Sequence, residues 1–151
     1  MNSAGTTTPR GRVRAKLYAA AAIVALLGLA DGIYLTIEHV TGRTAECIAS
    51  SGCQDVLSSK YAAIGHLPLA ALGAFAYFTV FSAALLAAFG YRKCRPFFAL
   101  VVTVMFGTTL WLLYLQAFVL HAFCDYCLFS AGVTTVLTAI AVATTFLRDR
   151  S

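Results

Sequence analysis

The chain has 151 residues, a length that fits one domain, and 60% of its residues are hydrophobic while only 11% are charged. This composition excludes an ordinary soluble domain, because the apolar excess must face lipid. The formal net charge of +5 does not indicate nucleic-acid binding, since no stripe of basic and aromatic residues accompanies it. We therefore expect an all-α integral membrane protein.

The chain begins with a basic segment, residues 1–16, which is expected to be a disordered cytoplasmic tail. The apolar run that follows is longer than the core of a signal peptide and has no small-residue cleavage motif, so we expect a retained span. Four such runs are long enough to cross the hydrocarbon core, which takes about 20 helical residues. A transmembrane domain of four helices is therefore predicted over residues 17–147, with spans at about 17–37, 67–89, 97–120 and 125–147 and a cytoplasmic end at 148–151.

The first two spans are joined by the one long connection, Glu38–His66. It is the only predicted segment outside the membrane that is large enough to fold over the bundle. Within it, Val56, Leu57 and Tyr61 are spaced to form one apolar face of a short helix over residues 53–61. This helix is expected to lie at the interface as an amphipathic lid.

Basic residues predict the orientation of the spans. Four of them precede the first span, three lie between the second and third spans, and two follow the fourth. By the positive-inside rule these segments face the cytoplasm. The long connection and the turn before the fourth span then face the extracytoplasmic side of a cell inner membrane, and both termini are cytoplasmic.

Two cysteine pairs lie at the predicted extracytoplasmic boundary. Cys124 and Cys127 have the two-residue spacing of disulfide oxidoreductases and open the fourth span, where helix N–H groups lower the pKa of one thiol. Cys47 and Cys53 enclose a flexible loop, which suits disulfide exchange, a static disulfide or, together with the other pair, a zinc site. Cys94 lies among cytoplasmic basic residues, where thiols stay reduced, so we leave it outside any relay.

These residues resemble the bacterial branch of the vitamin K epoxide reductase family. The resemblance rests on the loop pair Cys47 and Cys53, on Ser59 six residues after Cys53, and on the Cys124-x-x-Cys127 motif. It covers nearly the whole chain. It implies a membrane enzyme that oxidises a thioredoxin-fold partner and passes two electrons to a quinone of the menaquinone, ubiquinone or vitamin K type, with no metal.

The resemblance also implies a role for each residue. Cys47 would exchange with the partner, and Cys53 would receive the electrons and attack Cys124. Cys127 would be the thiolate that delivers the electrons to the quinone, and Ser59 would hydrogen-bond within the site. Many bacterial relatives carry a fused thioredoxin-like domain. No such domain follows here, so a separate extracytoplasmic thioredoxin-fold thiol oxidase is the expected partner, within a lipid membrane.

Two positions depart from the animal members of that family. Those enzymes place a polar side chain near the start of the second span and a tyrosine four residues after the last cysteine. Leu69 and Ala131 stand there in this chain. Both are expected near the quinone, but neither side chain forms a hydrogen bond with it, which makes vitamin K epoxide a weaker guess for the substrate.

Asp31 lies within the first apolar span, where an ionisable residue is a candidate for function such as proton transfer in quinone chemistry. The interpretation that we favour is a carboxyl that reaches interfacial water or is paired with a polar neighbour such as Tyr34, Gln116 or His121. Three other functions stay open for the whole chain. They are the second family of four-helix quinone-linked disulfide oxidases, whose paired cysteines lie in the first outer loop, a carrier or binding protein for heavy-metal ions, and a structural tetraspan protein.

Overall fold

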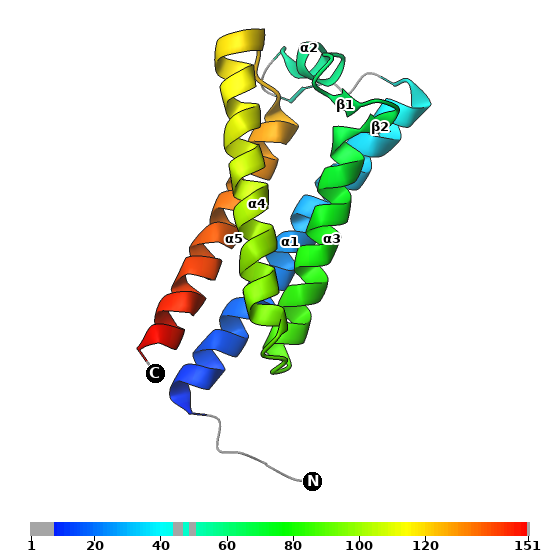
Figure 1. Ribbon diagram of the computed structural model, residues 1–151. Helices are drawn as coiled ribbons and strands as arrows, with labels where there is room; N and C mark the ends of the chain where they lie inside the picture. Colours follow the sequence, from blue (N-terminus) through cyan, green and yellow to red (C-terminus); the bar gives the residue numbers. More distant parts are fainter. Residues whose placement is uncertain (1–7, 44–46, 49–50, 151) are drawn as a thin grey trace.

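The computed structural model describes residues 8–43, 47–48 and 51–150. Its long helices are α1 (Pro9–Thr41), α3 (Leu69–Ala88), α4 (Cys94–Tyr114) with its π-helical continuation η1 (Leu115–Leu120), and α5 (Asp125–Asp149). The short helix α2 (Cys53–Leu57) and the antiparallel hairpin of β1 (Ala63–Ile64) and β2 (Leu67–Pro68) lie across one end of the bundle (Figure 1). The start of α1 and the end of α5 lie at the other end.

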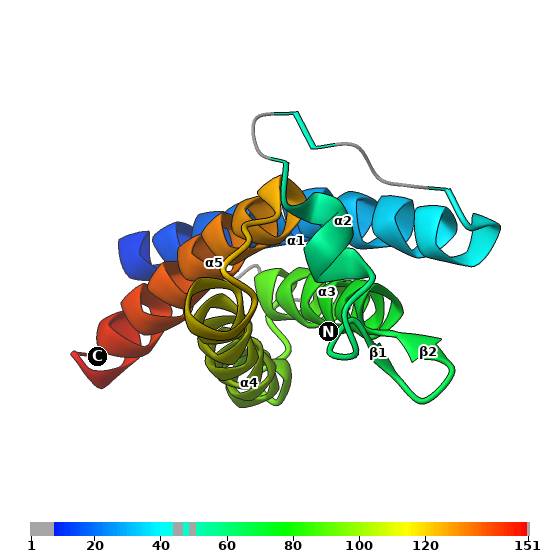
Figure 2. The same cartoon turned by 90° about the horizontal axis from the view of Figure 1, so that it is seen from above.

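The four long helices confirm the predicted membrane bundle, because each is long and apolar enough to cross a bilayer. With 33 residues, α1 is about 50 Å long, more than the roughly 30 Å of hydrocarbon. It runs obliquely past the other helices (Figures 1 and 2). Large apolar side chains cover the outside of the bundle, for example Phe75, Leu100 and Phe146, which are 72%, 62% and 63% exposed. Such a surface requires lipid around it.

The basic segment before the first span is largely helical. The Thr8 hydroxyl accepts a hydrogen bond from the Gly11 N–H at 3.3 Å, and Pro9 occupies the first helical position, so the helix has a regular N-terminus. The expectation of a disordered tail as far as residue 16 is therefore wrong for residues 9–16, while residues 1–7 lie outside the described part of the chain. At the other end α1 continues to Thr41 and ends at Gly42, whose φ of 67° is left-handed.

Close packing of α1, α3 and α5 holds the middle of the bundle together. A Cβ atom on Gly32 of α1 would lie 3.1 Å from the Ala74 backbone of α3, and one on Gly28 would overlap the Tyr77 ring. The Tyr77 hydroxyl in turn forms a hydrogen bond with the hydroxyl of Thr134 of α5 at 2.9 Å. Small residues let membrane helices approach in this way. These contacts fix the three helices around the site described below.

The long connection covers the end of the bundle as predicted, but its structure differs in detail (Figure 2). The helix expected over residues 53–61 ends at Leu57. The hydroxyls of Ser58 and Ser59 donate to the carbonyls of Gln54 and Val56 at 2.6 and 2.7 Å, which favours a turn over further helix. The hairpin follows, so the second span begins at residue 69 and not at 67, and the third begins at residue 94 and not at 97.

Candidate functional site

The two cysteine pairs lie in one cluster at the α2 end of the bundle. Cys47 and Cys53, the outer pair, form a disulfide with their Cα atoms 5.6 Å apart, whereas Cys124 and Cys127, the inner pair, are free thiols. Cys53 is 1% exposed and Cys124 is fully buried, and both pack with Val56. Cys47 and Cys127 are partly buried at the margin of the same cluster. The fold thus brings together two pairs that are far apart in the sequence.

Gly52 makes the approach of the two pairs possible. It immediately precedes α2, and a Cβ atom there would lie 2.6 Å from the Phe123 oxygen and 2.8 Å from the Phe123 nitrogen. Because both of these are backbone atoms, no side-chain rotation relieves the overlap. Gly52 precedes Cys53 and Phe123 precedes Cys124, so this contact sets the spacing between the pairs. The sequence gives no sign of it, since the Gly52 φ of −89° suits any residue.

Gln116 holds the other side of the cluster. Its side chain is 2% exposed, and its Oε1 atom accepts a hydrogen bond from the Cys124 N–H at 3.2 Å. Its backbone carbonyl accepts a hydrogen bond from the Ala122 N–H, also at 3.2 Å. Gln116 lies in the π-helical segment η1, a widened turn of the kind often found at functional sites. In the sequence, the sign of its role is that it is a polar residue within an apolar span. It was predicted only as a possible partner of Asp31.

The Cys124 thiol lies at the start of α5, just outside the membrane-spanning helix. A hydrogen bond from the Cys127 thiol lowers the pKa of Cys124, burial acts in the opposite direction, and the N–H groups of Cys127 and Tyr126 lower it further. Together they bring the pKa of Cys124 to about 7. The thiolate expected at the start of the fourth span is thus Cys124. Cys127, to which the resemblance assigned the thiolate, is instead the donor of the hydrogen bond that stabilises it.

The reduced inner pair should therefore show a thiolate that titrates near neutral pH. Above a pH of about 7 Cys124 should be mainly ionised, and the thiolate should be lost as the pH falls through this value. Thiolate ultraviolet absorbance in a Cys94→Ala background would measure it. Cys127→Ser keeps a hydroxyl donor and should titrate like the parent, whereas Cys127→Ala removes the donor and should titrate at higher pH. Identical curves for the serine and alanine variants would contradict this account.

A cavity of about 150 Å³ lies beneath α2 and the turn that follows it, enclosed by the long helices. Cys127 is the only cysteine among the described residues that line it. Ser59, Leu69 and Ala131, which the sequence singled out, also lie on its wall. The Ser59 hydroxyl is bonded to the Val56 carbonyl, so it fixes the turn that covers the cavity.

The cavity has the size of a small aromatic ring. Its walls are mainly apolar, and an apolar cavity of about 150 Å³ has the size that binds a benzene ring in proteins. Leu69 and Ala131 supply apolar wall and no hydrogen bond. Cys127 lies on the same wall. The two positions that differ from the animal enzymes therefore contribute only apolar surface.

Asp31 also lies on the cavity wall, half-buried on α1. Of its two predicted environments, pairing with Tyr34, Gln116 or His121 is wrong, since within the described part of the chain no hydrogen bond reaches its carboxylate. Contact with interfacial water stays a prediction. The Tyr34 ring packs instead on the Tyr126 ring, with centroids 5.4 Å apart. Oε1 of Gln116 is taken by the Cys124 N–H. The carboxylate is thus not a link between helices.

Cys94 and a row of aromatic side chains on the third span lie away from this site. Cys94 begins α4, far along the bundle from α2, and packs against the main core. Trp111, Tyr114 and Phe118 form a row of rings with centroids 6.0 and 5.1 Å apart. Their side chains are 59%, 51% and 67% exposed, so they face lipid.

Comparison with known proteins gives two findings. The model of the vitamin K epoxide reductase family matches residues 19–142. The thiol-disulfide oxidoreductase LTO1 of Arabidopsis thaliana is 35% identical over 128 residues, which cover 79% of this chain. The chain spans about a third of the length of that relative, 34%. The family match includes both cysteine pairs and the cavity wall.

Proposed function

Because the chain belongs to the vitamin K epoxide reductase family, we propose that this membrane thiol oxidoreductase forms disulfides in a thioredoxin-fold partner and passes the electrons to a membrane quinone. The observation that carries the proposal is the position of Cys127. It belongs to the cysteine cluster and also lies on the cavity wall. A residue shared by the two sites is what electron transfer between protein thiols and a small apolar acceptor requires.

The proposed relay is a series of disulfide exchanges. A partner thiolate attacks Cys47, and Cys53 leaves as a thiolate that attacks Cys124 of an oxidised inner pair, from which Cys127 leaves. The second partner thiolate releases Cys47, which attacks Cys53 and frees Cys124. The outer disulfide and free inner thiols of the structure match the end of this series, when two electrons reside on the inner pair.

The last step returns the inner pair to a disulfide. A bound quinone supplies an acceptor for two electrons and two protons. On the protein side, the hydrogen bond between the two inner thiols keeps Cys124 ionised and Cys127 protonated. Cys124 is therefore the nucleophile available to close the disulfide with Cys127. Ser59 and Gly52 serve this step indirectly, because they hold the cover of the cavity and the outer pair in place.

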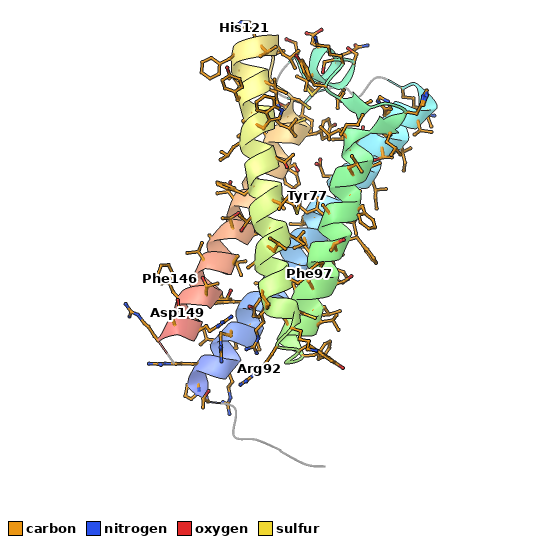
Figure 3. The ribbon with its side chains drawn as sticks, in the orientation of Figure 1. Tyr77, Arg92, Phe97, His121, Phe146 and Asp149 are labelled. Atoms are coloured by element: carbon orange, nitrogen blue, oxygen red, sulfur yellow. A yellow bond between two sulfur atoms is a disulfide. The ribbon has the colours of Figure 1, made fainter. Side chains whose placement is uncertain are left out.

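The proposed orientation has the cysteine cluster on the extracytoplasmic side of an inner membrane. Figure 3 shows Arg92 and Asp149 at the end of the bundle opposite His121, which marks the cluster end. The basic residues in the first turns of α1, around the start of α4 and at the end of α5 all belong to that opposite end. Their concentration there supports cytoplasmic termini.

The test of this function is quinone reduction by the purified protein in liposomes. We expect the protein to reduce menaquinone or ubiquinone when it is supplied with a reduced thioredoxin-fold protein, with one disulfide formed for each quinone reduced. A Cys94→Ala variant should behave in the same way, because Cys94 lies outside the cluster. Oxidation of the partner without any quinone reduction would overturn the proposal.

A further inference from the structure

We propose that Asp31 is a catalytic residue whose carboxylate takes the proton from the Cys127 thiol and passes it to a quinone oxygen. This rests on the proposed function, because it assigns the proton path in the same cavity. The argument comes from the position of the carboxylate, from its lack of a structural partner, and from the proton balance of the inner pair.

Asp31 lies within a helix that is apolar enough to cross a membrane, an unusual place for an ionisable residue. It precedes the end of α1 at Thr41 by ten residues, a distance of about 15 Å along the helix axis. Among the described residues of the cavity wall it is the only carboxylic acid, and the wall includes neither lysine nor arginine. A carboxylate in such a place is costly and is retained mainly where it acts.

The neighbouring polar groups use their hydrogen bonds elsewhere. The Tyr77 hydroxyl bonds to the hydroxyl and carbonyl oxygens of Ser130, at 2.6 and 3.0 Å, and to the Thr134 hydroxyl at 2.9 Å. The Gln116 Oε1 atom bonds to the Cys124 N–H. Within the described chain the Asp31 carboxylate has no such bond. It is therefore available to the contents of the cavity, where the Cys127 thiol is also found.

The chemistry of the inner pair requires a proton acceptor at this place. In the reduced state Cys127 holds a proton and hydrogen-bonds to the Cys124 thiolate. Oxidation forms the Cys124–Cys127 bond, breaks the Cys127 S–H bond and releases two electrons and one proton. Asp31 carries that proton to one oxygen of the quinone. The second oxygen takes its proton from solvent water, so that the products are one disulfide and one quinol.

Other titratable groups lie around Asp31, and the experiment must distinguish their titration from that of Asp31. Tyr77 reaches it from α3, and Cys124, Tyr126 and Cys127 reach it from the start of α5. Two more lie on the cavity wall, Tyr61 of the covering turn and His39 of α1 itself. Glu38 is on the same helix but is not among the wall residues. Glu38→Gln therefore replaces a carboxylate with an amide, as Asp31→Asn does, but at a position outside the cavity wall.

The experiment compares Asp31→Asn, Asp31→Glu and Glu38→Gln in the full chain. With quinone, Asp31→Asn should lower kcat by about a hundredfold or more, the usual effect of losing a proton-transfer group, with little change in KM. Asp31→Glu should restore much of the rate, and Glu38→Gln should match the wild type. Without quinone, the midpoint potential of the inner pair is measured against pH. The Cys124 thiol should give one inflection at a pH of about 7 in every variant. The wild type should show a further inflection that Asp31→Asn lacks and that both other variants keep.

The outcomes separate this inference from the proposed function. An Asp31→Asn protein with unchanged kcat and an unchanged inflection would overturn the role of Asp31. If Asp31→Asn and Asp31→Glu lose activity equally while the inflection persists, Asp31 has only a structural role and the proposal also fails. A wild-type protein that reduces no quinone would refute the proposed function, and with it the transfer to a quinone oxygen. The pH dependence of the midpoint potential would still show whether Asp31 is coupled to the inner pair.

Discussion

A Cys127→Ala variant is expected to lose quinone reduction by at least about a thousandfold, the order of loss seen when one member of a group of reacting residues is removed. Cys127 is the only cysteine among the described residues of the cavity wall, and Cys124 is fully buried behind it. No other thiol is therefore placed to reach an acceptor in the cavity. The decrease in quinone absorbance, with a reduced dithiol as donor, measures the loss.

The control for this prediction is the exchange reaction of the outer pair. The Cys47–Cys53 disulfide does not depend on Cys127, so the variant should still exchange this disulfide with a protein dithiol. Retained exchange would show that the variant is folded. Quinone reduction at the wild-type rate would contradict the role of Cys127.

A Gly52→Ala variant is expected to slow electron transfer from the outer to the inner pair by about a hundredfold, the effect of roughly 1 Å of misplacement. The added Cβ would lie 2.6 Å from the Phe123 oxygen and would force α2 away from the start of α5. The variant should oxidise an inner pair that is already reduced at a normal rate, because the cavity wall does not include Gly52. Mass spectrometry of alkylated cysteines over time measures both steps.

Gly107→Ala is the matched control, since a Cβ there meets nothing within 4 Å. It should transfer electrons at the wild-type rate. Equal rates for Gly52→Ala and Gly107→Ala would mean that the contact with Phe123 does not set the spacing of the pairs.

The sequence predicted the bundle because membrane spans are encoded locally. A run of about 20 apolar residues is readable without any tertiary contact, and all four runs became long helices. The meeting of the two cysteine pairs was also predictable, since both lie at span boundaries on one side. Leu69 and Ala131 were chosen by their distance from motifs, and the structure puts both on the cavity wall.

The residues that the sequence did not reveal depend on contacts between distant segments. Gly52 is needed because of Phe123, and Gln116 is positioned by a widened helical turn that has no composition signal. The short helix was expected to reach residue 61, but the serines after Leu57 bond back to the preceding turn. Pairing of Asp31 with a polar neighbour was one expectation. It failed because hydrogen-bond partners across a bundle cannot be assigned from periodicity.

The relay makes one claim that can be tested directly, the transfer of a disulfide from Cys53 to Cys124. In a Cys47→Ala variant the cysteine that would resolve this intermediate is absent, so the intermediate should accumulate. Non-reducing peptide mapping should find a Cys53–Cys124 disulfide as the main cross-link between the two pairs, because both residues are buried in the same cluster. A main cross-link between Cys53 and Cys127, or no cross-link between the pairs, would contradict the relay.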